Sequence, residues 1–191
     1  MNILFIADLH YLNIDNLEKI KNLSYDICIL LGDIPKKYLD AIKEVVNNNK
    51  LYGITGNHDT FNLLEKNNIN DINMKIININ GIKIAGISGG VKYKFGMYAM
   101  LGQEELLEKI TNLQKCDILV SHETGYHYLK EDIAHEGFIA IDDYLKTYNP
   151  KYHIFGHYHN NYFFIKYNTS CYCVFQCSLL NYESGEMINI F

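Results

Sequence analysis

The sequence predicts an α/β fold, a four-layer αββα sandwich in which two mixed β-sheets face each other and helices flank them. Two observations predict it: short β-branched runs alternate with amphipathic segments, and two hairpin patterns interrupt the alternation. The alternation favours parallel strands joined by crossover helices, and the hairpins supply antiparallel strands for a second sheet. A length of 191 residues without a linker or repeat favours a single domain spanning residues 1–191.

Each element has its own local signal. Five apolar runs are too short for helices and are expected to be buried strands: Ile3–Ala7, Ile27–Leu31, Leu51–Thr55, Ile118–Val120 and His153–Phe155. Apolar residues at helical spacing predict the helices Leu17–Leu23, Lys37–Asn47, Gln103–Leu113 and Phe138–Tyr148. The pair Asn80-Gly81, typical of two-residue turns, predicts a hairpin over Lys75–Ile87. A second hairpin is expected over Asn161–Phe175, with its turn near Asn168–Ser170, and a last strand over Met187–Ile190.

The composition excludes several classes of protein. Hydrophobic residues make up 48% and charged residues 20% of the chain, which excludes a disordered polypeptide. A net charge of −5 argues against binding nucleic acid or a membrane surface through bulk electrostatics. All 17 basic residues are lysines, so no guanidinium group is present to bind phosphate in bidentate fashion. The first apolar run meets Asp8 too early for a signal peptide, and no run reaches the ~20 residues of a membrane span, so a cytoplasmic protein is expected.

Five cysteines, Cys28, Cys116, Cys171, Cys173 and Cys177, form a poor disulfide framework because their number is odd and their spacing irregular. The last three could suggest a small metal site, but no second ligand pair at zinc-finger spacing accompanies them. We therefore expect them to be small buried side chains of one apolar strand.

Polar residues follow each of the five predicted buried strands. The segments are Asp8-Leu9-His10, Gly32-Asp33, Gly56-Asn57-His58-Asp59, Ser121-His122 and Gly156-His157-Tyr158-His159. Because ligands bind beyond the carboxyl ends of strands in open α/β sheets, we expect all five segments at one edge of one sheet. A lone histidine after a strand is usually a surface residue, but five such segments in this order are specific.

This series of motifs resembles that of the calcineurin-like metallophosphoesterases, D-x-H, G-D, G-N-H-[DE], H, G-H-x-H, and every position is filled between Asp8 and His159. The resemblance implies two divalent metal ions per chain, with Mn²⁺ expected first and Fe, Zn²⁺, Ni²⁺ or Co²⁺ as alternatives. It assigns one ion to Asp8, His10 and His159. It assigns the second to Asn57, His122 and His157, with Asp33 bridging the two. It also implies catalytic roles for His58, Asp59 and Asn57.

The chemistry of these residue types agrees with that assignment. Carboxylate, imidazole and amide ligands suit such metals better than copper(I) or an iron–sulfur cluster. A water between two ions would lose its proton near neutral pH and attack phosphorus as a bridging hydroxide. The ions would also make the site locally positive, so an acidic protein could still attract phosphate. His58 could stabilise a phosphoryl oxygen or protonate the leaving oxygen, with Asp59 fixing its tautomer.

Three functions remain open at this stage. The first is hydrolysis of a small phosphodiester substrate, with a cyclic nucleotide among the candidates; the second is a small nuclease, and the third a catalytically silent scaffold that binds proteins. Gly32-Asp33 is followed by Ile34-Pro35, which departs from the protein phosphatase motif Gly-Asp-x-x-Asp-Arg-Gly. At 191 residues, we expect no DNA-binding cap like that of the related recombination nucleases. Glu123-Thr124-Gly125 replaces the proline-rich stretch common in the family.

Some residues outside the motifs could contact substrate. His135-Glu136-Gly137 is similar to a His-x-Gly segment of some cyclic-nucleotide phosphodiesterase-like members, which makes His135 a candidate contact. The loop tyrosines could stack on a base or pack on the surface: Tyr11, Tyr93, Tyr98, Tyr126, Tyr128 and Tyr158. Residues Gly86–Gly90 (GISGG) are interpreted as a turn after the hairpin, since they lack the Walker spacing. His153 is interpreted as a structural residue within a strand.

Overall fold

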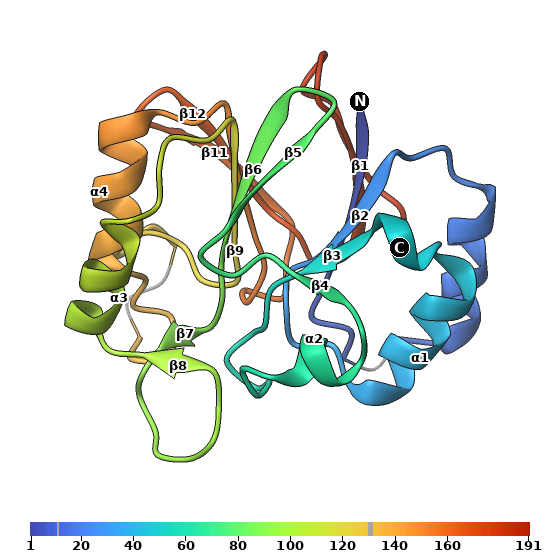
Figure 1. The fold of residues 1–191 in the computed structure, drawn as a ribbon, viewed down its shortest axis with the longest axis horizontal. Helices are drawn as coiled ribbons and strands as arrows, with labels where there is room; N and C mark the ends of the chain where they lie inside the picture. Colours follow the sequence, from blue (N-terminus) through green and yellow to red (C-terminus); the bar gives the residue numbers. More distant parts are fainter. Residues whose placement is uncertain (11, 130–131) are drawn as a thin grey trace.

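The computed structural model describes residues 1–10, 12–129 and 132–191 and has four layers, as Figure 1 shows. Two six-stranded sheets lie face to face, with helices outside each of them. The predicted α/β fold with two mixed sheets is confirmed. Among the described residues, every helix is too short or too polar to cross a bilayer.

The first sheet has the strand order β14-β13-β1-β2-β3-β4. Its parallel part consists of β1 (Asn2–Ala7), β2 (Ile27–Leu30), β3 (Leu51–Gly53) and β4 (Asn70–Asp71). Its antiparallel part consists of β13 (Gln176–Asn181) and β14 (Met187–Asn189). β1 is central, and its residues Ile3–Ala7 are fully buried because the strand has protein on both faces.

The second sheet has the order β11-β12-β10-β9-β6-β5. The strands β6 (Ile82–Ile87), β9 (Ile118–Ser121), β10 (Tyr152–Phe155) and β12 (Thr169–Cys173) run parallel. The edge strands β5 (Ile76–Ile79) and β11 (Tyr162–Lys166) pair antiparallel with their hairpin partners. Asn80 and Gly81 have φ values of 53° and 87°, the left-handed backbone that a type I′ turn requires. The second hairpin turns at Tyr167 and Asn168, with φ 49° and 65°, slightly earlier than expected.

Helices cover the outer face of each sheet. On the first sheet lie η1 (Ile14–Asn22) and α1 (Lys36–Val45), and on the second lie α3 (Gln103–Ile110) and α4 (Ile139–Tyr148). The segment expected as helix Leu17–Leu23 is a 3₁₀ helix, which Asn13 caps by accepting the N–H of Asp15. The remaining elements are short: η2 (Asn48–Lys50), α2 (Leu63–Lys66), β7 (Gly90–Val91) and β8 (Met100–Leu101).

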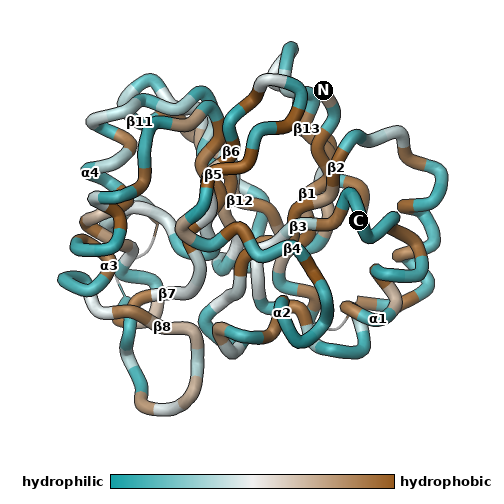
Figure 2. The backbone as a smooth tube through the Cα atoms, in the orientation of Figure 1, coloured by the Kyte–Doolittle hydropathy of each residue, from teal (hydrophilic) through white to brown (hydrophobic). Residues whose placement is uncertain are grey.

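Three buried clusters join the layers. Ile3, Phe5, Ile29, Ile84 and Ile154 belong to the cluster between the two sheets. A second cluster lies between the first sheet and α1 with η1, and a third lies between the second sheet and α3 with α4. Figure 2 shows the corresponding pattern, with hydrophobic colour along the strands and hydrophilic colour on the outer turns of the helices.

Two expectations about strand placement were wrong. The five motif-bearing strands do not form one sheet, because β9 and β10 pair with the hairpin strands of the second sheet. The last three cysteines do not share a strand either: Cys171 and Cys173 lie in β12, whereas Cys177 lies in β13 of the other sheet. All five cysteines are buried, and none forms a disulfide bond or belongs to a candidate metal group among the described residues.

Candidate metal centre

The polar segments converge at the carboxyl ends of strands from both sheets. A hydrogen bond connects the two sheets at this end, because the His157 N–H donates to Asp8 Oδ2 (2.7 Å). Within the second sheet, the Gly156 N–H donates to the His122 carbonyl oxygen (3.1 Å). His122 Nδ1 lies 2.7 Å from the Leu31 carbonyl oxygen in the first sheet. The side chains that were expected along one sheet edge are therefore brought together from opposite sheets.

One group of potential metal ligands consists of Asp8, His10 and His159, whose ligand atoms all lie within 4.8 Å of one another. Asp8 is fully buried, whereas His159 is half-exposed. His159 Nε2 lies 3.6 Å from Asp8 Oδ1. The side-chain interaction with Asp8 raises the pKa of His159. This group lies at the solvent-facing side of the centre.

A second group consists of Asp33, His122 and His157, also within 4.8 Å of one another and all buried. Asn57 Oδ1 lies 2.9 Å from His122 Nε2, so Asn57 joins this group. Burial alone would lower the pKa of His122, but the Asp33 carboxylate outweighs it and raises that pKa to about 10. A metal at this position must therefore displace a proton from His122.

Two buried carboxylate oxygens test whether the residues fit metal ions. Asp8 Oδ1 and Asp33 Oδ2 have no hydrogen-bond partner among the described residues. Their companion oxygens are satisfied, since Asp8 Oδ2 accepts the His157 N–H and Asp33 Oδ1 accepts the His58 N–H (2.8 Å). Leaving a buried carboxylate oxygen without a partner is costly unless a cation compensates it. Each oxygen faces histidines of one group, so both groups fit a divalent metal ion.

The backbone at this centre is strained. Asp8, Asp33, His157 and His159 have φ values between 51° and 73°, a left-handed region in which residues other than glycine are uncommon. Such conformations cost of order 1–3 kcal/mol each and persist where the surrounding structure imposes them, often at functional sites. Four of the seven predicted ligands are held in this way.

Gly56 allows the second and third loops to approach each other. A Cβ at Gly56 would lie 2.2 Å from Asp33 Oδ1 and 2.6 Å from the Asp33 nitrogen, closer than atoms can pack. A Cβ at Gly156 would likewise lie 2.8 Å from Asp8 Oδ2. Both glycines therefore leave space for the two carboxylates.

His58 and Asp59 lie beside the two groups. The His58 ring is 6.4 Å from the His10 ring, and partial loss of water around this exposed side chain lowers its pKa, with Lys94 adding to the effect. Asp59 has different partners from those expected: its Oδ2 accepts the N–H groups of Asp33 and Gly56, each at 2.8 Å. No hydrogen bond joins it to the His58 ring among the described residues. Asp59 thus holds two loops together and does not fix the His58 tautomer, because its carboxylate is turned toward the backbone.

Glu123 is a functional candidate that the motif pattern missed. It is fully buried, and its Oε2 lies 3.3 Å from His157 Nε2, which also lies 2.8 Å from the Ala134 carbonyl oxygen. The Glu123 Oε1 accepts the Thr124 N–H and the Tyr158 O–H, each at 2.8 Å. His157 Nε2 is thus occupied by the Ala134 carbonyl oxygen, with the Glu123 carboxylate beside it, and Nδ1 remains for a metal, an arrangement in which outer acceptors orient a metal-binding histidine. An acidic residue beside His122 was the only signal in the sequence.

The other candidates lie in different places. His135 packs on His157 with a ring separation of 4.6 Å, but its Nδ1 is 2.7 Å from Asp132 Oδ1.

The loop tyrosines differ in their surroundings. Tyr158 is buried, the Tyr93 hydroxyl lies 3.5 Å from Asn57 Nδ2, and the Tyr98 ring lies 6.4 Å from the His58 ring. Tyr126 is exposed and stacks on His127, and the Tyr128 hydroxyl donates to Asp142. Tyr11 lies outside the described residues. His153 is fully buried, with its Nε2 2.7 Å from Ser121 Oγ, which agrees with a structural role.

Comparisons with known proteins identify the class. The model of the calcineurin-like phosphoesterase family matches residues 1–161, and the chain therefore belongs to this family. No curated protein matches the chain in sequence.

Solved structures share the fold at low sequence identity. The protein TT1561 of Thermus thermophilus aligns with a TM-score of 0.68 and 14% identity, covering 100% of this chain and 99% of that one. The phosphopantetheinyl hydrolase PptH of Mycobacterium tuberculosis gives 0.64 and 12%, covering 92% and 89%. A novel archaeal phosphodiesterase gives 0.56 and 13%, covering 98% and 97%. The fold extends over almost the whole length of each neighbour.

Proposed function

We propose that this chain is a hydrolase of small phosphodiesters that uses two divalent metal ions. The supporting observation is the pair of adjacent ligand groups, each with a buried carboxylate oxygen that faces a histidine but has no hydrogen bond among the described residues. Asp8, His10 and His159 would hold one ion, and Asn57, His122 and His157 the other, with Asp33 between them. Divalent ions bound there would polarise phosphoryl oxygens and lower the pKa of a water. Mn²⁺ is the metal we expect first.

The protein's own groups prepare this chemistry. His157 is neutral near pH 7, because burial and the nearby His122 lower its pKa to about 3, and a neutral imidazole is the form that binds a metal. His58 is exposed and lies outside both ligand groups. A bound phosphodiester would bring negative charge beside His58 and favour its protonated form. His58 can then donate a proton to the leaving oxygen.

The test measures hydrolysis by His58→Ala and by His157→Ala in the presence of Mn²⁺. Two diesters are compared, one with a p-nitrophenolate leaving group and one with an alkoxide leaving group. His58→Ala should retain its metal by elemental analysis and lose roughly 10²–10⁴-fold in kcat on the alkoxide ester, the range for a positioned proton donor. Its loss on the p-nitrophenyl ester should be smaller, since that group leaves without a proton. His157→Ala should lose metal and fail on both esters, whereas the exposed His127→Ala serves as the control.

Two results would contradict the proposal. Wild-type protein that binds no metal under Mn²⁺ supplementation, or that hydrolyses neither ester, would remove its basis. Equal losses of His58→Ala on both esters would instead assign His58 to phosphate stabilisation. A screen that includes cyclic nucleotides and single-stranded DNA would separate the small-diester hydrolase from a nuclease.

A further inference from the structure

A pocket of about 440 Å³ opens beside the candidate metal centre, between two loops. One loop follows the Gly56–Asp59 motif and contributes Thr60, Phe61 and Asn62. The other is the segment 92–98 between β7 and β8, which contributes Met97 and Tyr98. None of the predicted metal ligands lines the pocket, so it is a separate feature of this chain.

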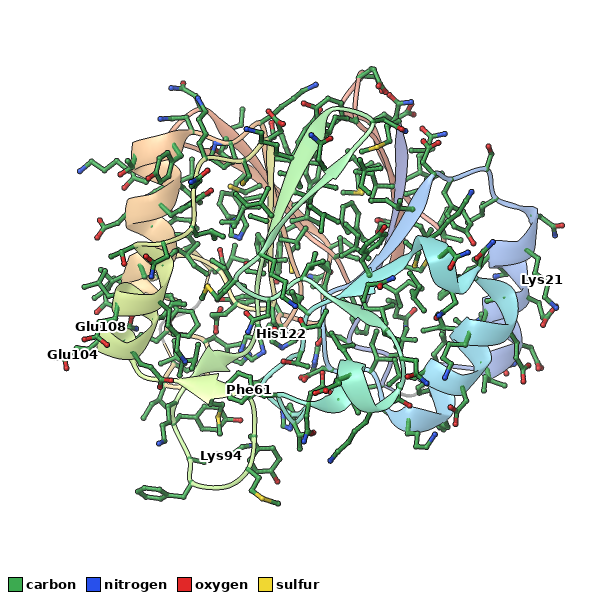
Figure 3. The ribbon with its side chains drawn as sticks, viewed as in Figure 1. Lys21, Phe61, Lys94, Glu104, Glu108 and His122 are labelled. Atoms are coloured by element: carbon green, nitrogen blue, oxygen red, sulfur yellow. The ribbon has the colours of Figure 1, made fainter. Side chains whose placement is uncertain are left out.

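The loop 92–98 is anchored to the candidate centre at its base. The Gly90 N–H donates to the Ala99 carbonyl oxygen (3.2 Å), and the Lys92 N–H donates to that of Leu101 (2.9 Å). The Ala99 N–H donates to the Asp59 carbonyl oxygen (2.7 Å), which ties the loop to the motif that carries His58. Figure 1 shows the loop projecting beyond β7 and β8, and Figure 3 places Lys94 on it. A shift of the Asn57–Asp59 segment would therefore also move one wall of the pocket.

A row of aromatic rings leads from the metal ligands to the pocket. The ring centroids of His159 and His10 are 5.0 Å apart, those of His10 and His58 are 6.4 Å apart, and those of His58 and Tyr98 are 6.4 Å apart. Tyr98 is both the neighbour of His58 and a wall of the pocket. A phosphoester with its phosphorus at the metal ligands could thus extend its organic group past His58 into the pocket.

The walls of the pocket have the chemistry that binds flat aromatic groups. Phe61 and Tyr98 are 43% and 41% exposed, and Met97 is 88% exposed, a concentration of accessible apolar side chains beside a polar centre. Such patches mark binding sites more often than chance surface, and aromatic rings and thioethers pack well against planar ligands. Lys94 Nζ lies 4.4 Å over the Tyr98 ring, which places a cation beside one wall of the pocket in a chain without arginine.

We propose that this pocket, through Phe61, Met97 and Tyr98, binds a planar aromatic group of the phosphoester substrate, a nucleobase or an aryl ring. The proposal rests on the proposed phosphodiesterase function and adds a substrate class to it. The rings of Phe61 and Tyr98 and the side chain of Met97 would pack against the aromatic group of the substrate while its phosphate occupies the metal centre. The site would then prefer diesters that carry an aromatic group over those that carry a small alkyl group.

The test uses three phosphorothiolate diesters that share methanethiolate as the leaving group and differ in the O-linked substituent: methyl, phenyl or thymidine 5′-yl. Because the bond broken is the same and the leaving group has no aromatic ring that could fill the pocket, the ratio of kcat/KM values reports the binding of the O-linked substituent. We expect the wild type to prefer phenyl over methyl by about 10-fold or more, in line with the strength of a base–aromatic stack. Phe61→Ala and Tyr98→Ala should each lower this ratio about 5-fold or more. Phe163→Ala, an exposed aromatic residue on β11, should leave the ratio unchanged.

The outcomes separate the pocket from the proposed function. Hydrolysis of all three diesters with equal kcat/KM, or ratios that survive both pocket substitutions, would overturn the pocket proposal while the hydrolase stands. Failure to hydrolyse any of them would overturn the proposed function. In that case, calorimetry on Mn²⁺-loaded protein with phenylphosphonate and methylphosphonate still tests the pocket, and equal affinities would refute it. Preference for thymidine over phenyl would identify a nucleobase as the group, and the reverse would identify an aryl ring.

Discussion

Replacing Glu123 by glutamine should weaken metal binding and, in the metal-free protein, increase stability at high pH. The substitution preserves the size of the side chain and removes its charge. The glutamine oxygen can still accept the Thr124 N–H and the Tyr158 O–H, which leaves the amide NH₂ facing His157 Nε2. Two donors then oppose each other, so the substitution disfavours the tautomer of His157 that keeps Nδ1 for a metal.

Each effect has an expected magnitude. Changes to the partner of a metal-binding histidine typically cost 10–100-fold in metal affinity, or about 1.4–2.7 kcal/mol. The opposite effect comes from burial, which raises the pKa of Glu123 to about 7 from its usual 4.5. The folded state therefore keeps a proton that the unfolded state loses, and stability falls as pH rises from 4.5 to 7. The total is about 3 kcal/mol, from 1.36 kcal/mol per pKa unit. Glutamine does not ionise, so Glu123→Gln removes this loss of stability with rising pH.

Calorimetric titration with Mn²⁺ and urea unfolding in chelator, at pH 5 and pH 8, measure the two effects. We expect Glu123→Gln to bind Mn²⁺ at least about 10-fold more weakly than wild type, and to lose less stability than wild type between pH 5 and pH 8. The exposed Glu105→Gln, which loses only a surface ion pair with Lys109, is the control. Unchanged Mn²⁺ affinity in Glu123→Gln would refute the role of Glu123 as the partner of His157.

Two further predictions concern buried groups. Burial lowers the pKa of His153 to about 3, so its contribution to stability is present above pH 6.5 and is lost as pH falls. His153→Gln should therefore lose about 2 kcal/mol less than wild type between pH 7 and pH 5 in urea unfolding, and equal losses would contradict the assignment. Gly56→Ala should lose metal by elemental analysis and about 1–3 kcal/mol of stability, because its Cβ overlaps Asp33. Gly102→Ala, whose Cβ would have no neighbour within 4 Å, should do neither.

Local patterns determined the elements of this protein and its candidate ligands. A continuous apolar run such as Ile3–Ala7 needs protein on both faces, and it is buried as a central strand. The pair Asn80-Gly81 favours the left-handed turn that the structure contains. The polar residues directly after strands were equally readable, because the end of a parallel strand fixes the side of the sheet on which its loop lies. These signals need only a few neighbouring residues.

The tertiary structure alone decided how these elements combine. Whether β9 pairs with β10 and β6 or with β2 depends on packing between residues far apart in sequence, and similar apolar runs satisfy either arrangement. Glu123 faces His157 only because Tyr158 and the Ala134 carbonyl, from other segments, enclose it. The same holds for the Asp59 carboxylate, which faces the backbone of a neighbouring loop, and for the pocket lined by Tyr98. Both form where loops from distant positions in the sequence meet. Burial and side-chain hydrogen bonds depend on contacts between segments that are far apart in the sequence, so no single segment predicts them.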